Sequence, residues 1–239
     1  MKFALIGYGK MGKEIEKIAV ERGHTIDLII DKDNLENLNS LNLKGIDVVI
    51  EFSNPESAFE NYKKCFSSGV PVVSGTTGWL DKLPQIITLC EQNNAGFFYA
   101  SNFSLGVNLF FQLNRNLARL MAPFKEYDVY MNETHHAMKL DTPSGTAITL
   151  AEGILAENPA KKSWKNDELV TAEELSIRSF REGDVPGTHE IIYTSEVDCI
   201  SIKHETKNRK GLALGAVLAA EFMKQKSGFY GMNDLLKIS

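Results

Sequence analysis

Residues 2–12, KFALIGYGKMG, decide the fold of the first part of the chain. The segment opens as a short apolar run typical of a buried strand, and a helical pattern follows its last glycine. The glycines have the GxGxxG spacing, in which the first allows a tight turn, the second lets the backbone approach a pyrophosphate, and the third lets helix and strand pack closely. The segment predicts a dinucleotide-binding turn whose contacts come from Gly7, Tyr8, Gly9, Lys10, Met11 and Gly12.

The first hundred residues continue this pattern, because short β-branched or aromatic runs alternate with helical segments. Runs with few charges are typical of strands that are buried on both faces of a parallel sheet. One helix is predicted to begin at Pro55, with Ser53 as its N-cap and Glu56 completing a capping box. The pattern predicts an α/β fold with a Rossmann-like, doubly wound parallel sheet. Its strands are expected at Lys2–Ile6, Thr25–Ile30, Ile46–Phe52, Val70–Ser74 and Gly96–Ala100.

Two charged residues follow the second expected strand. Asp31 stands where an acidic side chain accepts a hydrogen bond from the ribose of a bound dinucleotide. Because a strand, a helix and this acid all accompany the glycines, the alternative that the glycine turn serves packing alone is disfavoured. Lys32 could pair with the 2′-phosphate of NADPH or could be a solvated surface charge, and the residues leave both open. We infer that NADH and NADPH are both tolerated.

A second glycine loop, Gly75-Thr76-Thr77-Gly78, follows the fourth expected strand. Ligands of open α/β sheets bind outside the carboxyl ends of the strands, so this loop is a candidate for contacts to the nicotinamide half of the cofactor. The motif alone is also an ordinary turn into a helix, and the candidate depends on the GxGxxG turn upstream. The candidate contact residues are Gly75, Thr76 and Thr77.

The composition narrows the class of partner. A net charge of −5 and a pI of about 5.6 disfavour nucleic acid and acidic membrane surfaces, because like charges repel. We find no apolar stretch of bilayer length and no signal-peptide pattern, so we expect a cytoplasmic protein that binds no membrane. Its three widely spaced cysteines suit reduced thiols.

A second architecture begins after residue 102. An amphipathic stretch at Leu105–Leu120 precedes alternating segments that predict an antiparallel or mixed sheet with one solvated face. A last helix, from about Leu212 to Lys226, is expected to pack on the first domain. We therefore predict a dinucleotide-binding domain at 1–102 and 212–239, with an inserted α+β domain at 103–211 for substrate binding and oligomerisation. The inserted strands are expected at Tyr127–Glu133, Leu175–Phe180, His189–Thr194 and Val197–His204.

The segment ETHHAMKLDTPSGT, residues 133–146, holds the candidate chemistry. His135 and His136 are adjacent, Lys139 follows, and Ser144-Gly145-Thr146 opens a helical run. A histidine can donate a proton near neutral pH, a lysine supplies positive charge, and a helix N-terminus binds a carboxylate. The segment therefore predicts a site for a small anionic substrate that must be protonated.

A metal site is the main alternative for the histidine pair. Adjacent ligands point apart on an extended chain, and no cysteine or carboxylate cluster offers further ligands at the usual spacing. We therefore expect no metal. His24, His189 and His204 are expected to be surface or partly satisfied strand histidines.

With these motifs, the chain resembles the dihydrodipicolinate reductase family over nearly its whole length. The His-His-x-x-Lys-x-Asp-x-Pro-Ser-Gly-Thr-Ala block is highly specific, whereas the other motifs would be weak alone. The segments that carry the resemblance are the opening glycine turn, Gly75–Gly78, Ser101–Ser104, Glu133–Ala147, Arg181–Gly183 and Gly228–Tyr230.

The resemblance implies a reaction and an assembly. The reaction is the NAD(P)H-dependent reduction of 4-hydroxy-tetrahydrodipicolinate, a dicarboxylate, in lysine and diaminopimelate biosynthesis. It implies that His135 donates or accepts a proton, that Lys139 is a second donor, and that His136, Gly145 and Thr146 bind the carboxylates, beside Ser144. It also implies a homotetramer assembled through the sheet of the second domain. Further nicotinamide contacts are implied for Ala100, Ser101, Asn102 and Phe103.

The chain departs from the family pattern on the adenosine side. Its opening loop is one residue shorter than is common, and the segment after Asp31 is truncated, which bears on cofactor preference more than on the reaction. Two alternatives remain. Another two-domain Rossmann dehydrogenase would not be expected to carry the histidine and lysine block, and a non-catalytic NAD(P)-binding redox sensor has no use for a general acid.

Overall fold

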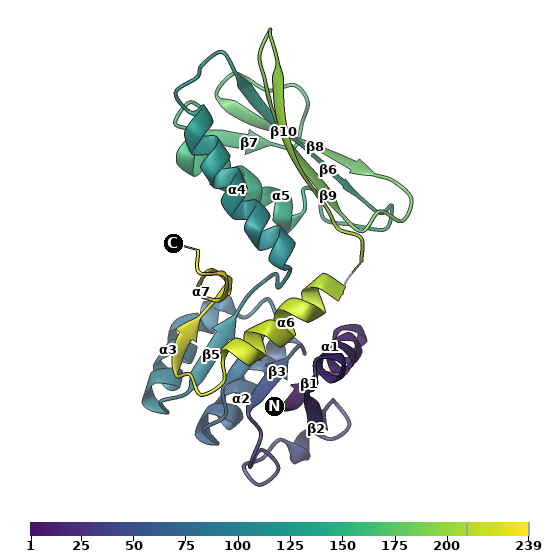
Figure 1. Ribbon diagram of the computed structural model, residues 1–239, viewed down its shortest axis with the longest axis vertical. Coiled ribbons are helices and arrows are strands. Elements are labelled where there is room, and N and C mark those ends of the chain that lie inside the picture. The colour runs from purple at the N-terminus through teal and green to yellow at the C-terminus, as the bar shows by residue number, and fades with distance from the viewer. Residues whose placement is uncertain (209, 239) are drawn as a thin grey trace. The chain divides into compact units, whose positions relative to one another are not determined.

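The computed structural model describes residues 1–208 and 210–238, which fold into two compact units (Figure 1). The first unit holds Met1–Leu105 together with the chain from Lys210 onward. The second begins at Gly106 and ends before Lys210. The boundaries expected from the sequence, after residues 102 and 211, lie a few residues from these division points. No helix in the described parts of the chain is long and apolar enough to cross a membrane.

The first unit is built on a six-stranded sheet in the order β11-β5-β4-β3-β1-β2, and every neighbouring pair is parallel. The carboxyl ends of the strands therefore meet at one edge, which is where open α/β sheets bind ligands. This sheet confirms the predicted α/β class. Its strands are β1 (Lys2–Ile6), β2 (Thr25–Ile30), β3 (Val48–Glu51), β4 (Val72–Ser74), β5 (Gly96–Tyr99) and β11 (Gly228–Tyr230).

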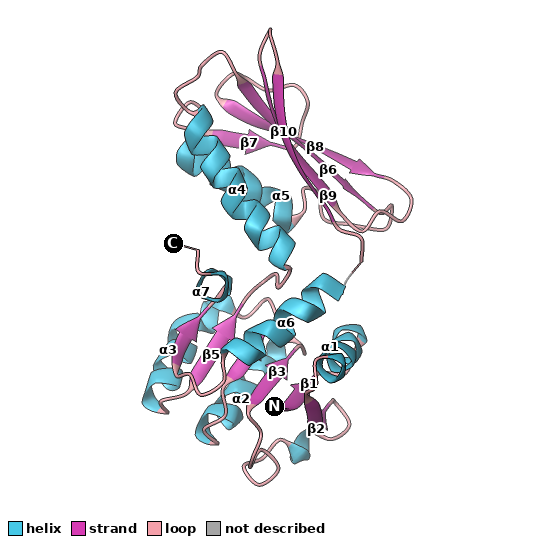
Figure 2. Ribbon diagram, in the orientation of Figure 1, coloured by secondary structure: helices cyan, strands magenta, loops and turns pink. Residues whose placement is uncertain are grey.

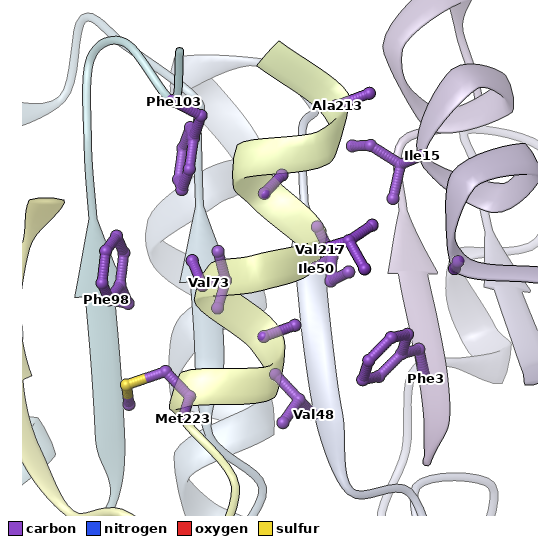
Figure 3. Packing of buried hydrophobic residues seen from close by; sticks show 14 of the residues in the cluster. Phe3, Ile15, Val48, Ile50, Val73, Phe98, Phe103, Ala213, Val217 and Met223 are labelled. Atoms are coloured by element: carbon purple, nitrogen blue, oxygen red, sulfur yellow. The ribbon is translucent and has the colours of Figure 1, made fainter. Parts of the chain in front are cut away.

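Helices cover both faces of this sheet, and alternate strand residues supply the two cores. Phe3 and Leu5 of β1 join the cluster under α1 and α6, whereas Ala4 and Ile6 join the cluster under α2 and α3. Figure 3 shows α6 lying across the first of these faces, with Val217 among the strand side chains. Removing these apolar surfaces from water is the main force that holds the layers together. The helices are α1 (Lys10–Glu21), α2 (Pro55–Ser67), α3 (Leu83–Gln92), α6 (Lys210–Phe222) and α7 (Met232–Leu236), with single 3₁₀ turns at Leu35–Asn37 and Leu80–Lys82.

The helix α2 begins at Pro55 as predicted, but its N-cap is Asn54 rather than Ser53. Asn54 Oδ1 accepts a hydrogen bond from the Ser57 backbone N–H at 3.0 Å. Ser53 instead donates its hydroxyl to the carboxylate of Glu51. The predicted cap was wrong because the sequence does not show that a buried acceptor lies behind Ser53.

The second unit is a five-stranded mixed sheet in the order β10-β9-β6-β8-β7. Its central strand β6 runs parallel to β8 and antiparallel to β9. Two helices, α4 and α5, cover one face and share an apolar cluster with it (Figure 2). The predicted α+β insertion with a mixed sheet is confirmed. Its elements are α4 (Leu105–Met121), β6 (Asp128–His135), α5 (Gly145–Glu157), β7 (Ser163–Lys165), β8 (Glu174–Arg181), β9 (Thr188–Thr194) and β10 (Cys199–Glu205).

Three short elements, β7, β11 and α7, were not predicted. Each is too short to produce a hydrophobic period that can be recognised along the chain. The strand β11 pairs with β5 and so makes the motif Gly228–Tyr230 part of the first sheet. The last long helix also begins earlier than expected, at Lys210 rather than Leu212.

Candidate active site

The glycine turn after β1 combines tight packing with open space. A Cβ on Gly7, whose φ is +89°, would lie 2.0 Å from the Phe52 carbonyl oxygen, and one on Gly12 would lie 2.3 Å from the Gly7 oxygen. A Cβ on Gly9, the N-cap of α1, would meet nothing within 4 Å. Gly7 and Gly12 therefore serve the turn itself, and the space beside Gly9 at the positive end of α1 fits a phosphate group.

Two pockets lie at the carboxyl edge of the first sheet and share Gly9, Phe52 and Ser53 in their walls. The first, of about 340 Å³, reaches the end of β2, and the second, of about 460 Å³, reaches the loop after β4. Their volumes suit parts of a small-molecule ligand. The predicted cofactor residues among their walls are Gly7, Tyr8, Gly9, Asp31 and Lys32 in the first and Gly9, Lys10, Met11, Gly12, Gly75, Thr76 and Thr77 in the second.

The two charges after β2 border the same pocket. Asp31 and Lys32 are both exposed, and the Lys32 backbone N–H donates to Asp31 Oδ1 at 2.9 Å. An acidic side chain at this place in a Rossmann-like sheet can accept a hydrogen bond from a ribose hydroxyl. Either charge can therefore meet the ribose end of a dinucleotide.

The segment Ala100–Phe103 follows β5 and is not among the described residues that line the two pockets. Phe103 is buried, and its ring centroid lies 5.5 Å from that of Phe52 and 5.8 Å from that of Phe98. Ser101 is exposed. Phe103 thus supports Phe52, which lines both pockets, and direct contact of the segment with a nicotinamide stays a prediction.

Three ionisable side chains gather on the helix-covered face of the second sheet. Glu133 and His135 lie two residues apart on β6 and therefore point to the same face, and His189 of β9 is the register partner of Glu133. His135 Nδ1 lies 3.5 Å and His189 Nε2 lies 3.7 Å from Glu133 Oε2. All three side chains are buried, and Glu133 is 0% exposed. We call Glu133, His135 and His189 the buried cluster.

The Glu133 carboxylate is the centre of this cluster. It accepts hydrogen bonds from the Ser144 backbone N–H at 3.1 Å, from the Ser179 hydroxyl at 2.7 Å and from Arg181 Nη2 at 3.3 Å. Burial raises the pKa of Glu133, but the hydrogen bonds from Ser144 and Ser179 outweigh it and hold the pKa below its ordinary value. The group is therefore a carboxylate at neutral pH, and it ties β6 to the start of α5.

The two histidines of the cluster differ in their affinity for a proton. Burial and the nearby His135 together lower the pKa of His189 to about 4, so His189 is neutral at neutral pH. Burial also lowers the pKa of His135, while Glu133 raises it in part and Lys139 lowers it again. Glu133 thus favours the protonated form of both histidines, and for His135 it is the largest effect after burial.

The buried cluster bears on the metal question. Its three members each present a ligand atom, all within 4.8 Å of one another, so the expectation that no carboxylate joins the histidines was wrong. His136, the other half of the adjacent pair, is half-buried and lies outside the cluster. A cation would have to displace the donors on Glu133, and the Arg181 guanidinium at 3.3 Å would repel it. That the site works without metal stays a prediction.

The start of α5 lies beside the cluster. Ser144 is its N-cap, since Ser144 Oγ accepts from the Ala147 N–H at 3.2 Å, and the same hydroxyl lies 3.1 Å from His189 Nε2. Ser144 is buried, so its hydroxyl serves the cap and the cluster. A Cβ on Gly145 would meet nothing within 4 Å, and Thr146 is partly exposed. The first N–H groups of a helix lack partners within it, so Gly145 and Thr146 can bind a carboxylate.

The loop that carries Lys139 is fastened by Arg181. Arg181 Nη2 donates to the Asp141 carbonyl oxygen and to Thr142 Oγ1, both at 2.7 Å. Lys139 Nζ donates to the two Asp141 carboxylate oxygens at 2.7 and 2.8 Å, and this bond lowers the pKa of Asp141. The His136 carbonyl oxygen accepts from the Lys139 N–H at 3.1 Å. Arg181 therefore joins the Lys139 loop to the buried cluster.

Three residues of this site were given no role from the sequence. Glu133 lies in the histidine block. Its spacing of two residues from His135, which puts both on one face of a strand, was the signal that could have identified it. His189 was expected to be an ordinary strand histidine, and its place depends on the register of β9 against β6. Phe52 directly follows β3, and nothing in the nearby sequence marks it as a residue that lines both pockets.

The chain matches two family models that together cover most of its length. They describe the N-terminus of dihydrodipicolinate reductase, over residues 1–103, and the C-terminus of dihydrodipicolinate reductase, over residues 106–236. The chain is 50% identical over 236 residues to the 4-hydroxy-tetrahydrodipicolinate reductase of Christiangramia forsetii, with 99% of this chain and 98% of the relative covered. It is 32% identical over 239 residues to that of Thermosipho africanus, with 99% and 98% covered.

Solved structures agree on the fold. A dipicolinate-bound dihydrodipicolinate reductase from Paenisporosarcina sp. TG-14 superposes with a TM-score of 0.78 at 24% identity, with 100% of this chain and 99% of that chain covered. An amine dehydrogenase from Mycobacterium smegmatis gives a TM-score of 0.58 at 9% identity, with 96% and 94% covered. Because the two family models together match residues 1–103 and 106–236, the chain belongs to the dihydrodipicolinate reductase family.

Proposed function

We propose that this chain reduces 4-hydroxy-tetrahydrodipicolinate to tetrahydrodipicolinate with a nicotinamide cofactor, in lysine and diaminopimelate biosynthesis. The observation that carries the proposal is the link from His135 through Glu133 to the open start of α5. We infer that this link joins a proton carrier to a carboxylate site, in a chain whose other unit has an open glycine turn for a dinucleotide. Two relatives named as this reductase support it. As a biosynthetic enzyme it would work in the cytoplasm.

His135 moves the proton in this proposal. A bound reduced nicotinamide supplies a hydride to the conjugated cyclic imine of the substrate. His135 protonates the adjacent carbon, so negative charge does not accumulate on the substrate unassisted. Glu133 favours the protonated form of His135, and the carboxylates of a bound substrate act in the same direction.

The substrate's two carboxylates need positive partners. The N–H groups of Gly145 and Thr146 at the positive end of α5 would hold one carboxylate, with His136 beside them. Lys139 would meet the substrate as a second donor and would stabilise negative charge that develops during reduction. Its pairing with Asp141 holds the ammonium in place before the substrate arrives.

Glu133→Gln is expected to move the pH profile of kcat/KM to lower pH. Glu133 raises the pKa of His135, so a neutral amide leaves that pKa lower, and activity that needs protonated His135 is lost at a lower pH as the pH rises. The measurement is kcat/KM against pH for both proteins. The control is Glu157→Gln, which neutralises a partly exposed carboxylate on α5 that is paired with Arg119. An unchanged profile would remove Glu133 from this role.

The cofactor preference is the next part of the proposal. We expect turnover with both NADH and NADPH, because Asp31 and Lys32 border one pocket. Lys32→Ala should lower kcat/KM for NADPH by up to about tenfold and leave that for NADH unchanged, since only NADPH has a 2′-phosphate for this exposed ammonium. Lys17→Ala, an exposed lysine further along α1, is the control. Equal losses with both cofactors would contradict the assignment.

The tetramer is a further proposal. The sheet face away from α4 and α5 carries Tyr130 and Arg178, whose guanidinium carbon lies 4.4 Å from the tyrosine ring centre. Arg178 Nε is buried and has no hydrogen-bond partner among the described residues. A second copy packed on this face could satisfy it. Light scattering at assay concentration should give the mass of four chains, and a monomer would contradict the proposal.

The decisive test couples purified dihydrodipicolinate synthase to this protein and follows nicotinamide absorbance. Oxidation of NADH or NADPH that depends on the synthase product is the expected result. Binding of cofactor without product-dependent oxidation would leave the sensor or another dehydrogenase as the better assignment. Omission of the synthase is the control for background oxidation.

A further inference from the structure

Glu51 is a buried carboxylate that the proposed mechanism does not use. It is the last residue of β3, it is 0% exposed, and its strand lies between β1 and β4 near the middle of the first sheet. It therefore lies at the carboxyl edge of the sheet, directly before Phe52, which lines both pockets.

The carboxylate ties together the loops that follow β3 and β4. Glu51 Oε1 accepts from the Ser53 N–H at 3.1 Å, from Thr76 Oγ1 at 2.9 Å and from the Ser53 hydroxyl. Oε2 accepts from Ser74 Oγ at 2.8 Å and from the Tyr62 hydroxyl at 3.1 Å. Every one of these donors is a neutral group.

No positive side chain balances this group. Glu51 forms no ion pair with any residue that the structure describes. Its influence reaches its neighbours: burial raises the pKa of Cys65, and Glu51 raises it further. Burial likewise raises the pKa of Tyr62, and Glu51 raises it further. The five neutral donors satisfy the oxygens of the carboxylate, but none of them cancels its negative charge, so that charge can act on a cationic ligand nearby.

The second pocket offers the place for that partner. Ser53 and Thr76 line it and also bond to Glu51, so the carboxylate lies one hydrogen bond behind the pocket wall. Lys10 is the one charged side chain among the described residues of that wall. The loop with Thr76 is the one assigned above to the nicotinamide half of the cofactor.

We propose that Glu51 supplies the counter-charge for the oxidised nicotinamide ring and so favours release of the hydride. This rests on the proposed function, because it places the nicotinamide beside Thr76. When a hydride leaves, carrying two electrons and one proton to the imine, the neutral ring becomes a cation. A fixed negative charge behind the wall stabilises that cation and leaves the neutral reduced ring almost unaffected. Glu51 acts through the wall and is therefore a positioning residue.

Glu51→Gln tests the charge with little change of shape. The amide oxygen can still accept from the Ser53 N–H, and the hydroxyls of Ser74 and Tyr62 can turn to accept from the amide NH₂. Titration calorimetry with NAD⁺ and with NADH gives both affinities without any dicarboxylate substrate. We expect Glu51→Gln to lower the affinity for NAD⁺ by at least about threefold and to change the affinity for NADH by less than about twofold. The control is Asp47→Asn, which removes a charge just before the amino end of the same strand. It should leave the ratio of the NAD⁺ and NADH affinities unchanged.

The competing explanation is that Glu51 only holds the two loops in shape. In that case Glu51→Gln weakens the binding of both nucleotides equally or of neither, and either result overturns the proposal. Glu51→Asp keeps the charge on a shorter side chain, so we expect weaker binding of both nucleotides at the wild-type ratio. A shift of the ratio in Glu51→Asp as large as in Glu51→Gln also overturns it.

The wild-type protein provides a test that does not depend on folding of a variant. NAD⁺ should bind more tightly than ADP-ribose, which lacks the cationic ring, and equal or weaker binding of NAD⁺ overturns the proposal. Failure of the proposed function has a different signature. A chain that binds neither NAD⁺ nor NADH fails as a nicotinamide enzyme, whereas one that binds both at a ratio insensitive to Glu51 fails only in this inference.

Discussion

Replacing His135 by glutamine should lower turnover by about two to four orders of magnitude, which is the usual contribution of a general acid. Glutamine can keep a polar contact with Glu133, but its amide does not deliver a proton near neutral pH. The substitution leaves the Glu133 hydrogen bonds to Ser144 and Ser179 in place, so the start of α5 should keep its shape. The loss should therefore fall on kcat, measured in the coupled assay with saturating cofactor.

Two controls separate chemistry from folding in this experiment. NADH binding, followed by fluorescence, should match wild type, because the dinucleotide turn lies in the other unit. His24→Gln replaces a histidine that pairs with Glu221 in the first unit and should retain turnover. Turnover of His135→Gln within about threefold of wild type would remove His135 from the role of general acid.

Much of the first unit could be predicted because its signals are local. A strand, a glycine turn and a helix follow one another within residues 2–21, so their spacing alone identifies a dinucleotide turn. Asp31 was predicted in the same way, as an acid at the end of a strand, and it lies in the wall of the first pocket. The failure at Ser53 has the same origin: local capping rules favour it, and only the buried Glu51 beside it changes where its hydroxyl points.

The candidate site could be predicted only in part, because half of it is made by strand register. His135, Lys139 and Gly145 lie within one segment, and their residue types indicated an anion and proton site. His189 and Arg181 reach the same place through β9 and β8, which pair with β6 on its two sides. No local pattern fixes that register, so the carboxylate and histidine cluster was missed and the argument against a third ligand was wrong.

Arg181 holds the loop that carries Lys139, and replacing Lys139 has the second large expected effect. It donates to the carbonyl oxygen of Asp141 and to Thr142, so the loop is held with the Asp141 side chain beside Lys139. The ammonium is about a quarter exposed, at 23% for its side chain, so it is neither fully solvated nor enclosed. A charge in such surroundings interacts with an anion more strongly than one in bulk water.

Lys139→Ala should lower kcat/KM by about two to three orders of magnitude, with KM raised and kcat lowered together. The change removes a donor to the substrate and also leaves the Asp141 carboxylate unpaired, where it repels the carboxylates of the substrate. The double variant Lys139→Ala with Asp141→Asn should therefore recover part of the loss in KM but not the loss in kcat.

Lys162→Ala removes an exposed lysine paired with Glu173 in the same unit and should change neither constant. Because Asp141, the partner of Lys139, is exposed, the pair contributes little to folding, and the melting temperature of Lys139→Ala should stay near wild type. A change in KM alone would show that Lys139 binds the substrate equally in its ground and transition states, and would leave His135 as the one group that assists the chemistry.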